Sequence, residues 1–282
     1  MFYRLDLSRQ LDVASEAAAA AAGLLQNWQQ DQLDIQEKRP GDLVTDADTK
    51  AETLILTILN RHFPSDPVLT EETGWHGLDQ GEFCWVVDPI DGTTNFTHGY
   101  PFASVSIGLL YQQHPVLGVV YDLFHHRLFQ ASHGQGATCN RRPIRVSASP
   151  TLAQSLLVTG FAYDRREVED NNYAEFCHFT HLTQGVRRGG SAALDLAFVA
   201  TGQLDGYWER GLSPWDIAAG IVLVQEAGGQ VSAYDGSPVD IFSGRVLATN
   251  GHLHAQMQTE LAQVRPLGQA FPMRCSSSEA QP

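Results

Sequence analysis

The stretch Trp85-Val-Val-Asp-Pro-Ile-Asp-Gly-Thr-Thr-Asn-Phe96 decides the fold of this chain of 282 residues. Its apolar start is typical of a buried strand that ends at Asp88, and its proline and glycine then favour a bend. We expect the bend to direct the carboxylates of Asp88 and Asp91 into the same space. The carbonyl of Ile90 is a third oxygen of the kind that Mg2+ binds. Asp-Pro and Asp-Gly alone are common in turns, but together behind a buried strand they predict a metal site.

The distribution of charge agrees with a metal site. The chain has a net charge of −14, which makes it a poor general partner for nucleic acid, because nucleic acid is bound largely through Lys and Arg. No Lys or Arg occurs between His62 and His126, although that stretch holds eight Asp and Glu residues. Carboxylates that converge without a local cation must take up protons or bind metal ions. Composition alone leaves open the alternative that these acids lie apart in water.

The cysteines and the apolar segments indicate a compartment. Cys84, Cys139, Cys177 and Cys275 lack the paired spacing of zinc or redox sites. Neither a signal peptide nor a membrane-spanning segment is visible, because the apolar run of residues 17–22 is too short to span a bilayer. We therefore expect a cytoplasmic protein that does not bind membranes.

The pattern of apolar residues predicts two helices near the N-terminus. The first is expected from Asp6 to about Gln36, with Asp12 as a cap. The second is expected to begin at Asp46 or Asp48 and to end before Pro64, where a helix cannot continue.

The remaining pattern predicts a layered α/β fold. Strand-like runs separated by turns dominate residues 67–143, and strands alternate with helices after that. We expect an N-terminal half over residues 1–145 that carries most of the metal ligands. A C-terminal half over residues 146–270 then carries Asp216 and the contacts to a substrate. Residues 271–282 are expected to be a disordered tail.

Further polar segments are candidates for the same site. Glu71 and Glu72 directly follow a short apolar strand, and Asp216 lies in the first turn of an apolar helix behind Pro214. The alternative for Asp216 is a helix-dipole contact, and for surface acids such as Glu72 it is simple solvation.

Two loops that precede helices are weaker candidates. One contains Asp42, Thr45, Asp46 and Asp48, and helix capping is the alternative for Asp46 or Asp48. The other, residues 187–195, has two glycines and a serine, so its backbone amides can face an anion or a substrate hydroxyl. A purely structural turn is the alternative.

Taken together, these segments resemble the inositol monophosphatase family of lithium-sensitive, magnesium-dependent phosphatases. The resemblance covers Leu11 to Val264 and is most specific in WVVDPIDGTTNFTH (85–98) and WDIAAGIVLVQEAGG (215–229). It implies an α/β fold in the form of an α-β-α-β-α sandwich, shared with the fructose bisphosphatases, and a homodimer with the site between the two halves of each chain.

The resemblance also implies a role for individual residues. The implied ligands of a first metal ion are Glu71, Asp88 and the Ile90 carbonyl. The implied ligands of a second are Asp88, Asp91 and Asp216, and Glu71 is implied to hold a weaker third ion. Thr93 and Asp48 are implied to orient the attacking water. The implied contacts to phosphate are the amides of Gly92 and Thr93, and the implied contacts to substrate hydroxyls are Gly190, Ser191, Ala192 and Glu209. Lys38 is the nearest counterpart of the lysine in the family's first loop.

The activity implied is Mg2+-dependent hydrolysis of a small sugar or polyol phosphate monoester, with myo-inositol monophosphate as the favoured substrate. Metal-activated water would attack in line, with two or three Mg2+ ions per site, Mn2+ as a substitute and Li+ as an inhibitor. Glu209 favours a polyol, because a carboxylate accepts hydrogen bonds from hydroxyls.

Other activities occur on the same fold. They are fructose-1,6-bisphosphatase, histidinol-phosphatase and 3′(2′),5′-bisphosphate nucleotidase. A non-enzymatic alternative is an RNA or transcription-complex partner that binds through a basic patch of Arg141, Arg142, Arg145, Arg165, Arg166, Arg187 and Arg188.

Overall fold

The computed structural model describes residues 5–28, 34–77 and 81–267. The helices described are α1 (Ser8–Gln26), α2 (Asp46–His62), α3 (Thr93–Thr97), α4 (Tyr173–Leu182), α5 (Ala192–Ala200), α6 (Pro214–Glu226) and α7 (His254–Gln263), with the 3-10 turns η2 (Leu152–Gln154) and η3 (Tyr163–Arg166). The strands described are β1 (Ile35–Arg39), β2 (Asp42–Thr45), β3 (Val68–Thr70), β4 (Gly74–His76), β5 (Phe83–Asp91), β6 (Ser104–Tyr111), β7 (His114–Asp122), β8 (Arg127–Ser132), β9 (Ala137–Cys139), β10 (Arg142–Pro143), β11 (Leu156–Thr159), β12 (Gly185–Arg187), β13 (Gly206–Arg210), β14 (Gln230–Ser232) and β15 (Arg245–Thr249).

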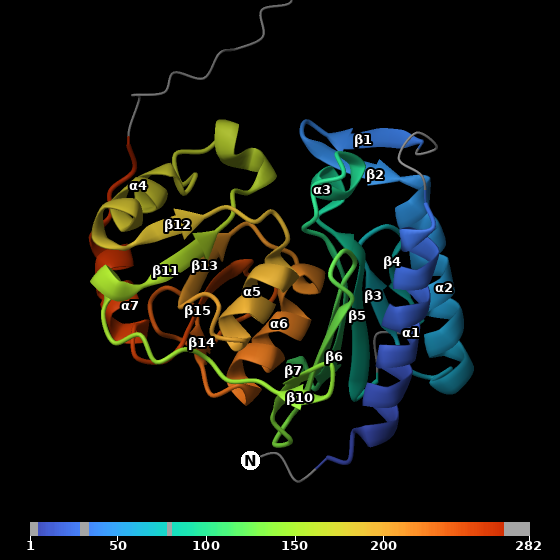
Figure 1. Cartoon of the computed structure of the whole chain (residues 1–282). Coiled ribbons are helices and arrows are strands. Elements are labelled where there is room, and N and C mark those ends of the chain that lie inside the picture. The colour runs from blue at the N-terminus through green and yellow to red at the C-terminus, as the bar shows by residue number, and fades with distance from the viewer. Residues whose placement is uncertain (1–4, 29–33, 78–80, 268–282) are drawn as a thin grey trace, which may run out of the picture.

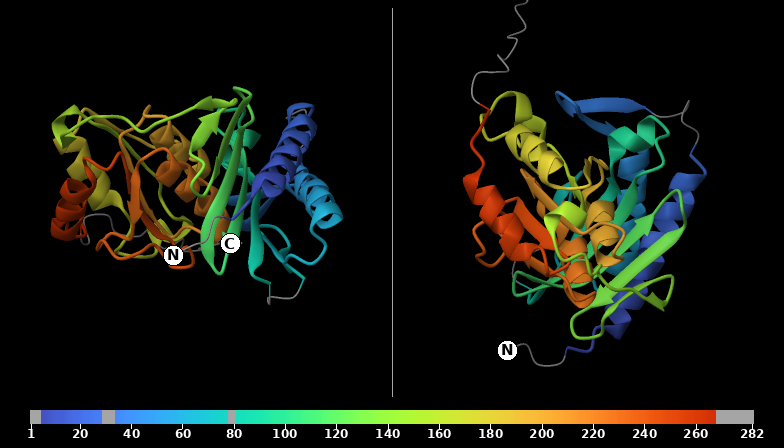
Figure 2. Two further views of the ribbon diagram at one scale, coloured as in Figure 1. Left: turned by 90° about the horizontal axis from the view of Figure 1, so that it is seen from below. Right: turned by 60° about the vertical axis from the view of Figure 1, so that its left-hand side comes forward.

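The strands form a small ribbon and two larger sheets. The ribbon pairs β1 with β2, the larger sheet has the order β10-β9-β8-β7-β6-β5-β3-β4, and the smaller sheet has the order β12-β11-β13-β15-β14. In Figure 1, α1 and α2 cover one face of the larger sheet, α5 and α6 lie between the two sheets, and α4 and α7 cover the far face of the smaller one. The two views in Figure 2 show the same sequence of layers. The predicted α-β-α-β-α sandwich is therefore confirmed.

Two glycines let α6 lie directly on the larger sheet. Gly108 on β6 and Gly118 on β7 are paired across the sheet. A Cβ atom on Gly118 would lie 2.2 Å from the carbonyl oxygen of Ala219 in α6, and one on Gly108 would lie 2.8 Å from the Cβ of Ala218. Side chains at these two positions would push the helix away from the sheet. The glycines thus fix how closely the start of α6 approaches the end of β5.

The helix α6 also belongs to a core shared by both sheets. Every residue from Ile217 to Val224 is buried, as expected for a helix that is apolar on all sides. The same cluster contains Val86 and Val120 of the larger sheet and Val158 and Tyr207 of the smaller sheet. The division of the chain into halves at residue 145 stays a prediction.

The N-terminal region differs from the prediction. The helix α1 ends at Gln26, and Ile35–Arg39 forms strand β1 instead of the end of that helix. The predicted cap is also wrong, because Asp12 lies inside α1 and Leu7 occupies the capping position. Antiparallel pairing of β1 with β2 accounts for the strand, since Ile35 pairs with Thr45 and Gln36 with Val44.

The other predicted elements agree with the structure to within a few residues. The second predicted helix is α2, and residues 67–143, predicted to be dominated by strand-like runs, contain strands β3 to β10. Strand β4 and the short helix α3 were not predicted. The predicted tail at residues 271–282 lies outside the described residues. None of the helices in the described ranges combines the length and the apolar character that crossing a bilayer requires.

Candidate active site

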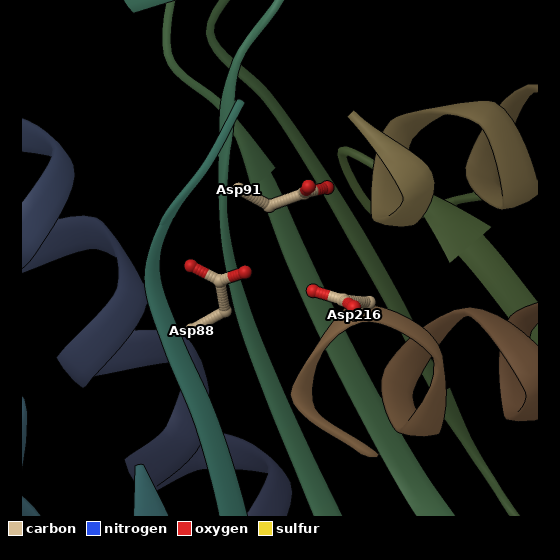
Figure 3. A group of neighbouring side chains, drawn as sticks. All are labelled: Asp88, Asp91 and Asp216. Atoms are coloured by element: carbon tan, nitrogen blue, oxygen red, sulfur yellow. The ribbon is translucent and has the colours of Figure 1, made fainter. Parts of the chain in front are cut away.

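Three carboxylates from separate parts of the chain meet between the two sheets. Asp88 and Asp91 come from the end of β5, and Asp216 comes from the first turn of α6. Each offers one oxygen atom, and these oxygens all lie within 4.8 Å of one another. Figure 3 shows the three side chains around a common space between β5 and α6. Carboxylate oxygens gathered in this way suit a hard divalent cation such as Mg2+.

The bend in the sequence motif is a β-bulge. Asp88 pairs with Ser106 of β6 and Asp91 pairs with Ser104, so three steps along β5 match two steps along β6. In a regular strand, two residues three positions apart point to opposite faces. The extra residue reverses this alternation, and both carboxylates therefore face the same side.

Asp91 is also hydrogen-bonded to the start of α5. Its Oδ2 accepts from Ser191 Oγ at 2.6 Å and from the backbone N–H of Ala193 at 2.7 Å, and its Oδ1 accepts from the N–H of Ala192 at 3.2 Å. The first turn of a helix has free N–H groups and a partial positive charge, so an anion is stabilised there. A side chain of the larger sheet thus caps a helix that packs on the smaller sheet. The donors of Ser191 and Ala192, predicted to contact a substrate, are engaged with Asp91.

Burial raises the pKa of all three carboxylates. The pKa of Asp88 lies well above its ordinary value because of burial and the charges of Glu71, Asp91 and Asp216. The pKa of Asp216 is raised well above its ordinary value by burial and by the charges of Asp91 and Glu71. Burial raises the pKa of Asp91 to about 6, against the hydrogen bonds from α5. Three acids this close cannot all be ionised without a cation between them, so the cluster suits a metal ion.

Thr93 and Asp48 lie next to this cluster. The Thr93 hydroxyl is within hydrogen-bond distance of Asp48 Oδ1, at 3.2 Å, and of the Ile90 carbonyl oxygen, at 3.0 Å. Asp48 Oδ2 accepts from the Thr45 N–H at 2.8 Å and from its hydroxyl at 2.6 Å, which closes a capping box at the start of α2. Burial raises the pKa of Asp48 to about 6. Asp48 therefore caps α2 and contacts Thr93 at the same time.

The nearby acids are paired with cations of the β1–β2 ribbon. Lys38 Nζ lies 3.1 Å from Glu71 Oε1 and 2.7 Å from Glu72 Oε2. Burial lowers the pKa of Lys38, but the two carboxylates raise it by more, so it stays protonated. Asp42 binds Arg39 in the same ribbon. Lys38 therefore reaches the acidic site, beside a predicted metal ligand.

Glu209 lies at the end of β13 in the same region. It is 8% exposed and accepts a hydrogen bond from the Tyr207 hydroxyl at 2.7 Å. Burial raises the pKa of Glu209 to about 7, although the bond from Tyr207 lowers it. A Cβ atom on Gly160 would lie 2.1 Å from Glu209 Oε2, so the glycine leaves room for the carboxylate.

Sequence reasoning missed three polar residues around the site. Tyr207 lies two positions before Glu209 in a strand, so the period of two could have placed both side chains on one face. Asn95 is inside the quoted motif, but its partner Gly189 is 94 residues away. Asp195 is 1% exposed, and its Oδ1 has no hydrogen-bond partner among the described residues. No local pattern in the sequence indicates that Asn95 contacts Gly189 or that Asp195 is buried around the site.

The fold and the site together define a layered α/β protein with a largely buried cluster of carboxylates that can hold a metal ion. A model of the inositol monophosphatase family matches residues 6–266. The chain belongs to the inositol monophosphatase family, which is a metal-dependent phosphatase family.

Individual relatives agree with this assignment. The chain is 58% identical over 264 residues to the inositol-1-monophosphatase of Synechocystis sp., covering 93% of this chain and 92% of the relative. It is 41% identical over 246 residues to the Nus factor SuhB of Pseudomonas aeruginosa, covering 85% and 91%. Among solved structures, the inositol monophosphatase of Anabaena (Nostoc) sp. PCC 7120 matches with a TM-score of 0.87 and 55% identity, covering 93% of this chain and 99% of that one.

Proposed function

We propose that this chain is a Mg2+-dependent phosphatase of small polyol phosphate monoesters, with myo-inositol monophosphate as its substrate. The convergence of Asp88, Asp91 and Asp216 within 4.8 Å carries the proposal, because a phosphate ester cannot approach such an acidic site without cations. The likeness to the inositol-1-monophosphatase of Synechocystis sp. supports the substrate.

The residues present fit magnesium. The candidate ligands are all oxygens, and burial disfavours their charged forms unless a cation is added. We assign the ligands to Glu71, Asp88, the Ile90 carbonyl, Asp91 and Asp216. Two or three bound Mg2+ ions would supply Lewis-acid chemistry, lowering the pKa of a water and neutralising the leaving oxygen. Replacement of Mg2+ by Mn2+ and inhibition by Li+ belong to the same proposal.

The chain's own groups orient the reactants. The Thr93 hydroxyl, held between Asp48 and the Ile90 carbonyl, positions the attacking water in line with the scissile bond. The backbone amides of Gly92 and Thr93 face the phosphate. No covalent phosphoenzyme is needed, because water is the nucleophile.

The alcohol part of the substrate lies toward the smaller sheet. We assign its recognition to Glu209 together with Gly190, Ser191 and Ala192. Because the Ser191 hydroxyl and the Ala192 N–H donate to Asp91, these residues would meet substrate hydroxyls through their oxygen acceptors. Tyr207 bonds one oxygen of the Glu209 carboxylate, and the other oxygen can accept a hydrogen bond from a polyol hydroxyl. This arrangement favours inositol over a phosphate ester without hydroxyls.

A panel of substrates tests the function. Phosphate release is measured with inositol 1-phosphate, fructose 1,6-bisphosphate, 3′-phosphoadenosine 5′-phosphate and histidinol phosphate, with Mg2+ and with excess chelator. We expect the highest kcat/KM for inositol 1-phosphate and no release under chelation. A higher kcat/KM for any of the other three phosphate esters would show that this ester, and not inositol 1-phosphate, is the preferred substrate. Phosphate release that persists with chelator would refute the metal-dependent mechanism.

The proposal includes a homodimer in a reducing cytoplasm. Light scattering coupled to size exclusion measures the oligomeric state, and cell fractionation measures the compartment.

The relative named Nus factor SuhB raises the alternative of a purely binding role. A chain selected only for binding has no need of two buried carboxylates and a partly buried one in a single cluster, so we favour the enzyme.

A further inference from the structure

A turn on the same side of the molecule as the smaller sheet contacts the segment that ends β5 of the larger sheet and begins α3. The turn is formed by residues 189–191, and the segment by residues 91–95. Asp91 accepts hydrogen bonds from Ser191 and the two residues after it. A Cβ atom on Gly92 would lie 3.1 Å from the carbonyl oxygen of Gly190. The two segments are therefore in contact along their length.

Asn95 joins the two segments by a hydrogen bond at one end of this contact. Its Nδ2 donates to the carbonyl oxygen of Phe102 at 2.8 Å and to the carbonyl oxygen of Gly189 at 3.0 Å. One amide group thus joins a loop after α3 to the turn that precedes α5. Both acceptors are backbone atoms, so the amide fixes the course of the chain rather than a flexible side chain.

The turn has little room to adopt another position. A Cβ atom on Gly189 would lie 2.2 Å from Asp195 Oδ1 and 2.5 Å from Cε1 of Phe102. Gly190 has a φ of +92°, a left-handed conformation that favours glycine. The turn is thus packed against Asp195 and Phe102, held by Asp91 at its Ser191 end and held by Asn95 at its Gly189 end. Loss of the Asn95 contact would free the Gly189 end alone.

We infer that Asn95 is a positioning residue that sets the specificity of the site for polyol phosphates. It holds Gly189, and through it the turn assigned to substrate hydroxyls, at a fixed distance from the Gly92–Thr93 amides assigned to phosphate. The inference rests on the proposed function. A substrate that spans both segments depends on this distance, whereas a substrate recognised by its phosphate alone does not.

Two variants of Asn95 test the inference. Asn95→Ala removes both hydrogen bonds, and Asn95→Asp in addition places a carboxylate against two carbonyl oxygens. The measured quantity is the ratio of kcat/KM for inositol 1-phosphate to kcat/KM for p-nitrophenyl phosphate, which has no hydroxyls. We expect the ratio to fall about ten- to a hundredfold, through a higher KM for inositol 1-phosphate, and to fall further in the Asp variant.

A matched control removes the same kind of bond elsewhere. The Asn250 amide donates to Ser147 Oγ at 3.0 Å and to the Ser149 carbonyl oxygen at 2.9 Å. It follows the end of β15 that pairs with Gly206, at the opposite end of β13 from Glu209. Asn250→Asp should lower the melting temperature without changing the ratio.

A second variant guards against a folding defect in the first. Gly189→Ala displaces the same turn from its other side and should lower the same ratio, with melting temperatures recorded for every variant. An unchanged ratio in folded Asn95 variants, or an equal fall in Asn250→Asp, overturns the inference alone. If the unaltered chain does not hydrolyse inositol 1-phosphate, both the proposed function and this inference fail.

Discussion

Replacing Asp91 by Asn separates metal binding from folding. The substitution keeps the size of the side chain and removes its charge. If Asp91 is a metal ligand, the variant binds Mg2+ much more weakly, because a neutral amide replaces a carboxylate. If Asp91 serves only to cap α5, the substitution changes stability and leaves the response to Mg2+ intact.

The structure sets the expected magnitudes. The pKa of Asp91 is raised from 3.8 to about 6, so in metal-free protein well above pH 6 its ionised form costs roughly 3 kcal/mol of stability. Asn avoids this cost, but its NH2 group then faces a donor of Ser191, Ala192 or Ala193, which costs about 1–3 kcal/mol. The two effects nearly cancel. We therefore expect the metal-free variant to be as stable as the unaltered chain to within about 2 kcal/mol.

Thermal melting at pH 8 with and without Mg2+ provides the assay. At a Mg2+ concentration of 100 Kd the unaltered chain should gain about 2.7 kcal/mol, whereas the variant should gain little. Its turnover should fall at least about a hundredfold. Asp205→Asn is the control, because Asp205 is also buried and accepts two hydrogen bonds, from Ser147 and the Leu156 N–H. An equal Mg2+-induced gain in Asp91→Asn and the unaltered chain would refute the assignment.

Three further perturbations have expected outcomes. Tyr207→Phe removes a hydrogen bond that lowers the pKa of Glu209, which is about 7, so the pKa should rise in the variant. Ionised Glu209 is the form that accepts hydrogen bonds from hydroxyls, so KM should fall with rising pH, and in the variant this fall should occur at higher pH. A series of KM measurements for inositol 1-phosphate across pH would show the shift. Thr93→Val should lower turnover at least about a hundredfold while Mg2+ still raises the melting temperature; loss of both would make Thr93 structural. Gly118→Ala should lower the free energy of unfolding by about 1–3 kcal/mol in urea titrations, because the new methyl group meets the Ala219 carbonyl; an unchanged midpoint would contradict the packing described for α6.

Features that depend on short stretches of sequence could be predicted. The bend at Asp88 and Asp91 follows from a proline and a glycine behind an apolar run, and the buried helix behind Pro214 follows from its continuous apolar residues. Both are local properties of the backbone and of side-chain polarity. The order of such elements along the chain predicted mixed layers of sheet and helix, whereas the α-β-α-β-α sandwich was implied by the resemblance to the family.

Features that depend on distant partners could not be predicted. The residues of β1 are all exposed and show no apolar alternation, so pairing with β2 alone makes them a strand. The hydrogen bond from Ser191 to Asp91 joins residues 100 positions apart. One sequence contains no signal for such a pair, and so the capping of α5 by a predicted metal ligand emerges only from the structure.

The position of Asp216 in the chain has a consequence for synthesis on the ribosome. It is made 125 residues after Asp91, an interval of about 6–25 s at ordinary rates of elongation. Throughout that interval the nascent larger sheet lacks α6, the helix that covers one of its faces. Asp88 and Asp91 also lack Asp216, the third carboxylate of the cluster. The carboxylate cluster is thus completed late in synthesis, and a chain released early exposes an apolar surface to chaperones or to aggregation.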